Sequence, residues 1–191
     1  MEIEIMMTGI GGQGVQLIAQ TLARAATLED RDVMLLGTYG GTMRGGNTDS
    51  TMVIADQPVS SPPMLSKIGV ALAMHHEFWG NLEMRLRPGA VVILNDSVFV
   101  GDVTDKDVIV HRIPATKLAN DLKLPMGAAM VFLGAYAKLS GIVSLESLIA
   151  AMTASLPSYR TQHIESNTKA LTAGYESVEA NLSPAWAEKA A

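Results

Sequence analysis

Hydrophobic and polar positions change their spacing repeatedly along the first 113 residues. Short apolar or alternating runs of strand length are separated by stretches with helical spacing, and beyond Pro114 the helical spacing takes over. The pattern predicts strands over 4–8, 31–36, 48–55, 70–74, 90–94 and 107–113, and helices over 15–25, 78–86, 116–122, 126–139, 144–156 and 162–181. This order predicts an α/β fold with a Rossmann-like, open, mostly parallel sheet flanked by helices and a helical C-terminal part.

Several of these elements carry more detailed expectations. The run 48–55 alternates and is rich in Thr and Val, which is typical of a strand with one exposed face. The apolar runs 70–74 and 90–94 are typical of buried parallel strands. The pair Pro88-Gly89 is expected to stop the helix over 78–86, and Ser144 is expected to cap the helix that follows it. We expect one domain over 1–191, with an α/β layer over 1–113 and a mainly helical part over 114–191.

Composition limits the classes of partner. Hydrophobic residues make up 48% of the chain and charged residues 17%, a balance that favours a full core over disorder. The net charge is -5 without runs of Lys or Arg, so neither a nucleic-acid surface nor an anionic membrane surface is expected. The apolar stretch 127–143 contains Lys138 and is shorter than the roughly 20 residues of a membrane span. We expect a soluble, cytoplasmic protein.

The residues that bind metals in proteins are sparse. The chain has no cysteine, so it offers no thiolate nucleophile and no cysteine ligand for an iron–sulfur cluster. His75 and His76 are adjacent, and neighbouring side chains on a strand point to opposite faces. We therefore expect a structural or surface role for this pair and no metal site.

A first glycine segment lies between a predicted strand and a predicted helix. Gly9, Gly11 and Gly14 have the spacing G-x-G-x-x-G, which permits a tight turn, close approach of a ligand and exposure of helix amides to an anion. The alternative is a tight turn that binds nothing. A dinucleotide site also needs an acid at the end of the second strand, but Glu29 and Asp30 precede that strand. A complete NAD site is therefore not expected.

A second glycine segment surrounds a single cation. Arg44 lies in the stretch 42–48 among glycines and small polar residues, and its planar guanidinium suits phosphate or carboxylate groups. Several glycines within so short a stretch cost conformational entropy, which favours a functional reason for them. The alternative is a solvent loop in which the arginine packs against its own surroundings.

Together these two segments resemble a known family. Residues 9–15, Gly-Ile-Gly-Gly-Gln-Gly-Val, followed by 39–46, Tyr-Gly-Gly-Thr-Met-Arg-Gly-Gly, are similar to the gamma subunit or domain of 2-oxoacid:acceptor oxidoreductases. This group acts on pyruvate, 2-oxoglutarate, branched-chain 2-oxoacids and indolepyruvate. The resemblance extends over nearly the whole chain and includes residues 167–175, which resemble the closing helix of the family.

The resemblance implies a non-catalytic subunit that helps to bind CoA and to assemble a complex. It implies alpha, beta and ferredoxin-like partner subunits that hold thiamine diphosphate, magnesium and iron–sulfur clusters, and also a flavin or NAD subunit in some complexes. The complex would convert a 2-oxoacid such as 2-oxoglutarate, pyruvate or phenylglyoxylate into an acyl-CoA. No catalytic residue and no metal ligand is implied in this chain. The implied CoA-binding residues are Gly11, Gly12, Gln13, Gly14, Tyr39, Thr42, Arg44, Gly45, Gly46 and Asn47.

Two departures from the family pattern bear on the expected contacts. Gly41 and Thr42 stand where many members have Pro and Glu, and Ala129 stands where many have Asn. Two alternatives to the CoA-binding subunit remain open. One is a stand-alone NAD(P)-binding reductase of the Rossmann type, in which Tyr39 would be the proton donor. The other is a purely structural subunit whose glycine segments contact protein.

Overall fold

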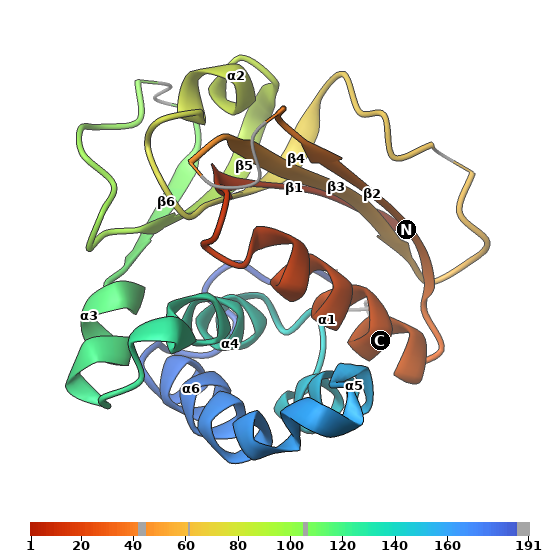
Figure 1. Cartoon of the computed structure of the whole chain (residues 1–191). Coiled ribbons are helices and arrows are strands. Elements are labelled where there is room, and N and C mark those ends of the chain that lie inside the picture. Colours follow the sequence, from red (N-terminus) through yellow and green to blue (C-terminus); the bar gives the residue numbers. More distant parts are fainter. Residues whose placement is uncertain (42–44, 61, 105–106, 187–191) are drawn as a thin grey trace.

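The structure is a computed structural model that describes residues 1–41, 45–60, 62–104 and 107–186. A six-stranded sheet lies against a layer of helices (Figure 1). The strands are β1 (Glu2–Ile10), β2 (Asp32–Tyr39), β3 (Asn47–Ala55), β4 (Ile68–Ala73), β5 (Leu86–Asn95) and β6 (Ile109–Ile113). The helices are α1 (Val15–Leu28), α2 (Trp79–Glu83), α3 (Ala115–Asp121), α4 (Ala128–Ser140), α5 (Leu145–Ser155) and α6 (Ile164–Glu176), with 3-10 turns at Pro125–Gly127 and Ser158–His163.

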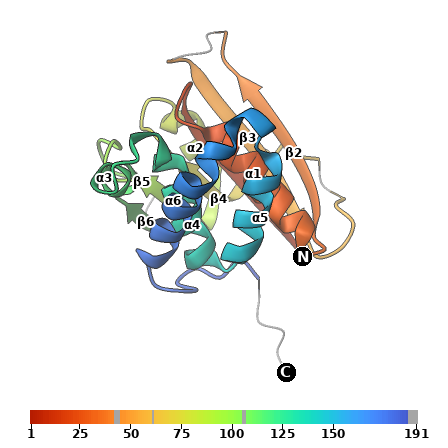
Figure 2. The same ribbon diagram turned by 60° about the horizontal axis from the view of Figure 1, so that its bottom comes forward.

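The strand order is β2-β3-β1-β4-β5-β6. Strands β1, β4, β5 and β6 pair in parallel, whereas β3 is antiparallel to both β1 and β2. β2 and β3 form a curved hairpin at one edge of the sheet (Figure 2), since only the second glycine segment joins them and so short a connection cannot cross over to a parallel strand. The predicted mostly parallel sheet with flanking helices and a helical C-terminal part is confirmed.

The main core lies between the sheet and the helices α1, α3, α4, α5 and α6. Strand side chains such as Ile5 and Met7 belong to the same buried cluster as residues of α1 and α4, and α4 is buried on almost all sides. Two glycines allow α4 and α6 to approach closely: a side chain at Gly134 would collide with the Leu171 carbonyl, and one at Gly174 with the Val131 carbonyl.

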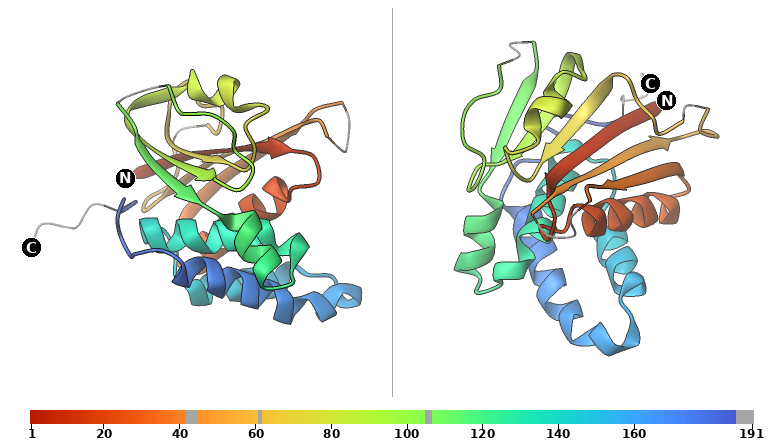
Figure 3. Two further views of the ribbon diagram at one scale, coloured as in Figure 1. Left: turned by 90° about the vertical axis from the view of Figure 1, so that its left-hand side faces the viewer. Right: turned by 45° about the horizontal axis from the view of Figure 1, so that its top comes forward.

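The opposite face of the sheet carries a smaller core under α2 and the adjoining loops (Figure 3). Val53 of β3 packs there with Leu65, and Val59 lies against the same cluster. The expectation of an exposed face on the strand 48–55 is therefore wrong, because β3 is buried on both sides along most of its length. Alternation of Thr and Val along a strand does not show whether its second face is exposed to water or covered by a loop.

Two predicted boundaries are also wrong. The helix predicted over 78–86 ends at Glu83, and Leu86 already belongs to β5. Pro88 and Gly89 do not stop a helix but lie within β5, where the pairing with β4 shifts its register. The last helix ends at Glu176 instead of 181, since the following residues turn back and the Asn181 amide donates to the Lys138 carbonyl at 3.0 Å.

The predicted cap of the helix over 144–156 is confirmed. The Ser144 hydroxyl accepts a hydrogen bond from the Ser147 amide at 3.1 Å, and α5 begins at the next residue, Leu145. Among the described residues, none of the helices has the length and apolar character needed to cross a membrane.

Candidate functional site

The first glycine segment forms the turn between β1 and α1. Gly12 has φ +103° and Gly14, the residue that caps α1, has φ +84°; side chains other than glycine rarely adopt such values. A Cβ atom added at Gly12 would meet none of the described residues within 4 Å, whereas one at Gly14 would lie 3.0 Å from the Ala129 Cβ. The Cβ side of Gly12 is therefore open to a ligand, whereas the Cβ side of Gly14 is occupied by α4.

The four amides of this turn are not equivalent. The Gly11 amide donates to the Gly46 carbonyl at 2.8 Å, and the Gln13 amide donates to the Ile10 carbonyl at 3.1 Å. The Gly12 and Gly14 amides have no hydrogen-bond partner within the part of the chain that the structure describes. Two of the four predicted amides thus hold the turn together, and two remain for an anion at the N-terminus of α1.

The structure brings the two glycine segments into contact. The Gly45 amide donates to the Gly11 carbonyl at 3.3 Å, which complements the bond from Gly11 to Gly46. Tyr39 is the last residue of β2, and nothing is described of its side chain. Thr42 and Arg44, which were predicted at this site, lie outside the described residues.

Asn47 begins β3 beside these glycines. Its carbonyl accepts the Gly40 amide at 2.7 Å, and its side-chain Nδ2 donates to Asp49 Oδ2 at 2.8 Å. The Asn47 Oδ1 atom is buried without a partner among the described residues. Since a buried polar atom normally has a partner, this oxygen is free to accept from a ligand or from the protein segment next to it.

The Gln13 side chain stabilises the turn through two hydrogen bonds to the backbone. Its Oε1 accepts from the Ile10 amide at 3.0 Å, and its Nε2 donates to the Met74 carbonyl at 3.4 Å. Sequence reasoning missed the equivalent role of Gln16, whose Nε2 donates to the Asp49 carbonyl at 2.7 Å. Both glutamines are engaged by protein groups, so the ligand contacts expected of Gln13 would require these bonds to be exchanged.

A cleft of about 200 Å³ lies beside the glycine turn at the carboxyl ends of the parallel strands. In the sheet, β2 and β3 lie to one side of β1, and β4 lies to the other side, so the direction in which strands are added changes at β1. Ligands of open α/β sheets bind at such a point. Ala129, one of the departures from the resembled pattern, lies in the wall of the cleft. The lining residues are Gly12, Gln13, Met74, Val98, Thr116, Pro125, Met126, Ala128 and Ala129.

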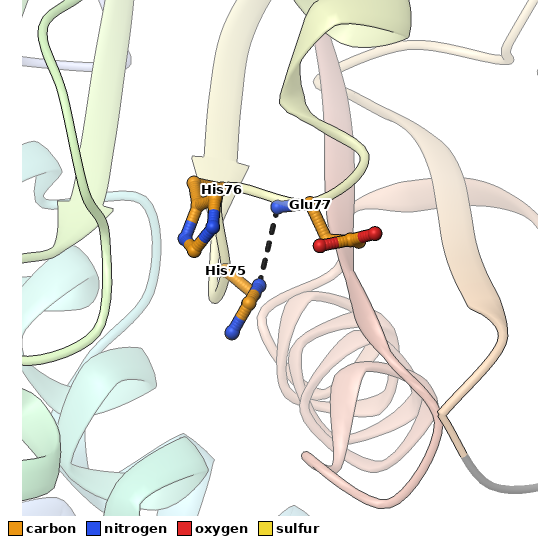
Figure 4. Close-up of side chains that lie close together, drawn as sticks. All are labelled: His75, His76 and Glu77. Atoms are coloured by element: carbon orange, nitrogen blue, oxygen red, sulfur yellow. Dashed lines mark hydrogen bonds between the residues drawn. The ribbon is translucent and has the colours of Figure 1, made fainter.

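The adjacent histidines lie directly after β4. Their rings stack with centroids 4.4 Å apart and planes 24° apart, so they point the same way (Figure 4). The expectation that they would point to opposite faces is wrong, because β4 ends at Ala73 and the pair belongs to the following turn. Burial of the ring, reinforced by the neighbouring His76, lowers the pKa of His75, while Glu77 opposes this shift.

The donor atoms of His75, His76 and Glu77 lie within 4.8 Å of one another, which raises the question of a metal ion. The lone pairs of an imidazole lie in the plane of its ring, so in stacked rings they run side by side and do not converge. In addition, His75 Nδ1 already accepts the Glu77 amide at 3.1 Å. The arrangement therefore does not offer three converging metal ligands.

Comparisons with known proteins agree on one family. A family model described as pyruvate ferredoxin/flavodoxin oxidoreductase matches residues 4–177. The chain is 34% identical over 179 residues to the 2-oxoglutarate synthase subunit KorC of Methanocaldococcus jannaschii, covering 92% of this chain and 94% of that protein.

Solved structures give the same result. The gamma subunit of a keto/oxoacid ferredoxin oxidoreductase from Geobacter sulfurreducens is similar with a TM-score of 0.77 and 29% identity, over 92% of this chain and 95% of that one. A 2-oxoglutarate:ferredoxin oxidoreductase from Magnetococcus marinus, solved with 2-oxoglutarate, coenzyme A and succinyl-CoA, shares the fold with a TM-score of 0.78 and 18% identity. That match covers 94% of this chain and 32% of the other.

Proposed function

Because the chain belongs to the pyruvate ferredoxin/flavodoxin oxidoreductase family and corresponds to its gamma subunits, we propose that it binds CoA for an acyl-CoA-forming 2-oxoacid oxidoreductase. The observation that carries the proposal is the backbone of Gly12, which lines the cleft and belongs to the turn that the second glycine segment contacts through Gly11, Gly45 and Gly46. Gly12 thus presents backbone without a side chain to the cleft at the strand ends.

The chemistry of CoA suits these groups. Its diphosphate is an anion, and the amides of Gly12 and Gly14, which have no partner among the described residues, lie just before a 14-residue helix whose N-terminus favours negative charge. The open space over Gly12 leaves room for a phosphate to approach the backbone. The Magnetococcus marinus enzyme, whose structure contains CoA and succinyl-CoA, supports this choice of ligand.

The remaining chemistry is assigned to partner subunits. The chain has no cysteine, so cysteine-ligated iron–sulfur clusters would be held by a ferredoxin-like subunit, and thiamine diphosphate with magnesium by alpha and beta subunits. This chain would position CoA so that its thiol reaches the acyl group formed in a neighbouring subunit. It is proposed to have no catalytic residue of its own.

The test is a CoA titration of the assembled complex, purified through a tag on this chain, with 2-oxoglutarate and pyruvate as separate substrates. We expect larger subunits with thiamine diphosphate and iron–sulfur clusters to co-purify, and the KM for CoA to rise in Gly12 variants while the KM for the 2-oxoacid stays constant. An unchanged KM for CoA, in variants that still assemble, would leave a purely structural subunit as the better account.

A further inference from the structure

The two stacked histidines lie next to the glycine turn. Gln13 of the turn donates to the carbonyl of Met74, the residue before His75, and Met74 also lines the cleft. Val98, from the segment after β5, lines the same cleft and bonds His76 through its carbonyl at 3.2 Å. The pair therefore lies at the rim of the cleft, on the side formed by the ends of β4 and β5.

The hydrogen bonds of the two rings determine where their protons lie. His75 Nδ1 accepts the Glu77 amide, so the neutral ring carries its proton on Nε2. The Val98 carbonyl can only accept, so His76 Nδ1 is the donor there and its Nε2 keeps a lone pair. A neutral pair thus offers one N–H donor and one acceptor side by side. A proton added to His76 makes both outer nitrogens donors.

The Glu77 carboxylate acts directly on this pair, since one of its oxygens lies within 4.8 Å of the histidine donor atoms and its charge raises the pKa of His75 against the larger effect of burial. The Glu77 carboxylate projects away from the side to which both rings point (Figure 4). On the segment after β5, Asp96 is held by Arg112 at 3.0 Å, and Phe99 contacts His76 through its ring edge at 6.4 Å. None of the residues that line the cleft in the described part of the chain is a lysine or arginine. Among the described residues, a protonated histidine at the rim can therefore supply positive charge to a phosphate in this cleft.

We propose that His75 and His76 bind a phosphate group across the cleft from the Gly12 and Gly14 amides, and that binding takes up one proton on the pair. The expected ligand class is a nucleotide diphosphate or phosphate monoester. Only the identification of this ligand as CoA rests on the proposed function. A single proton is expected, because two positive rings 4.4 Å apart would repel each other.

The first test uses inorganic pyrophosphate and the full chain, with binding followed by calorimetry between pH 6 and pH 8. One linked proton predicts that the affinity falls by up to about tenfold per pH unit as the pH rises. His76→Gln should weaken binding roughly tenfold at pH 6 and abolish the pH dependence, whereas His76→Arg should retain binding without pH dependence. His111→Gln, which removes a histidine bonded to Ser183, serves as the matched control and should behave as the wild type.

Two results would overturn the inference: a wild-type chain that does not bind pyrophosphate, or a His76→Gln variant of unchanged thermal stability that keeps both the affinity and its pH dependence. A second titration, with CoA and the assembled complex, separates this inference from the proposed function. If the KM for CoA changes in a Gly12 variant but not in His76→Gln, the histidine site is contradicted and the proposed CoA role is not. If pyrophosphate binding depends on His76 but the KM for CoA changes in neither the Gly12 variant nor His76→Gln, the CoA role is contradicted and the phosphate site is not.

Discussion

Glycines occur at two places in this molecule for opposite physical reasons. At the contact of α4 and α6, Gly134 and Gly174 lack a side chain because the backbone of the other helix occupies that space. At the turn after β1, Gly12 has φ +103°, and none of the described residues lies within 4 Å of its Cβ position. The first arrangement closes a core, and the second leaves a backbone accessible. A glycine therefore marks a candidate binding site only where the space beside it is open.

The largest effect is expected from Gly174→Val. The added atoms would collide with the Val131 carbonyl, and because both helices are buried in the main core, neither can move aside without disturbing it. Overpacking of this kind costs up to about 3 kcal/mol, or more where backbone is displaced. Urea denaturation should show the loss. Gly80→Ala in the short helix α2, where a Cβ would meet nothing, is the control, and a Gly174→Val midpoint equal to that of the wild type would contradict the account.

Gly12→Phe should leave the fold intact but impair CoA binding. A side chain at this position points into open space, so it would exclude a phosphate from the amides without meeting the core. We expect the KM for CoA to rise roughly ten- to hundredfold, the equivalent of one charge-assisted hydrogen bond or a little more. Steady-state kinetics of the assembled complex would measure this change.

The matched control for Gly12→Phe is Gly101→Phe. Gly101 has φ +99° and likewise nothing within 4 Å of its Cβ position, so this variant carries similar backbone strain at a position that does not line the cleft. If Gly12→Phe and Gly101→Phe change the KM for CoA equally, the change does not come from exclusion of CoA at Gly12, and the account is contradicted.

Arg44→Ala tests the second glycine segment. If its guanidinium binds a phosphate of CoA, its loss should raise the KM for CoA by roughly tenfold or more, and increased salt should reduce the difference between variant and wild type. Arg44→Lys should recover only part of the loss, since an ammonium lacks the planar fork of donors. A KM for CoA that is unchanged in Arg44→Ala would assign this segment to protein contacts.

The smallest effect is expected from Ser144→Ala, which removes the cap of α5. A lost N-cap costs about 1 kcal/mol, so the thermal midpoint should fall by about 2–4 °C while the KM for CoA stays the same. Differential scanning calorimetry and the kinetic assay together would check this prediction. A change in the KM for CoA would mean that the stability of α5 affects CoA binding in the cleft.

Local sequence signals predicted most of the fold. The strand before the first glycine segment, the helix after it and the Ser144 cap all depend on residues close together in the chain, so periodicity and capping rules are sufficient to find them. The failures depend on distant residues. The second face of β3 is covered by the loop that contains Val59 and Leu65. The residues 48–55 alone therefore could not predict that this face is buried.

The candidate site shows the same division. The spacing of Gly9, Gly11 and Gly14 predicted a tight turn that permits close approach of a ligand, but not which amides are engaged, since the partner of the Gly11 amide, Gly46, lies 35 residues away along the chain. The histidine pair was misjudged for a local reason. The predicted strand 70–74 already ended before His75, so the rule for neighbouring strand residues did not apply, and the orientation of the rings is set by the turn after β4.

The most direct test of the central claim is hydrogen–deuterium exchange of the assembled complex with and without CoA. If CoA binds in this cleft, peptides that cover 11–17 and 74–77 should exchange more slowly when CoA is present, and NADH should have no such effect. If CoA protects only segments of the partner subunits and leaves both of these peptides unchanged, this chain does not bind CoA at its glycine turn.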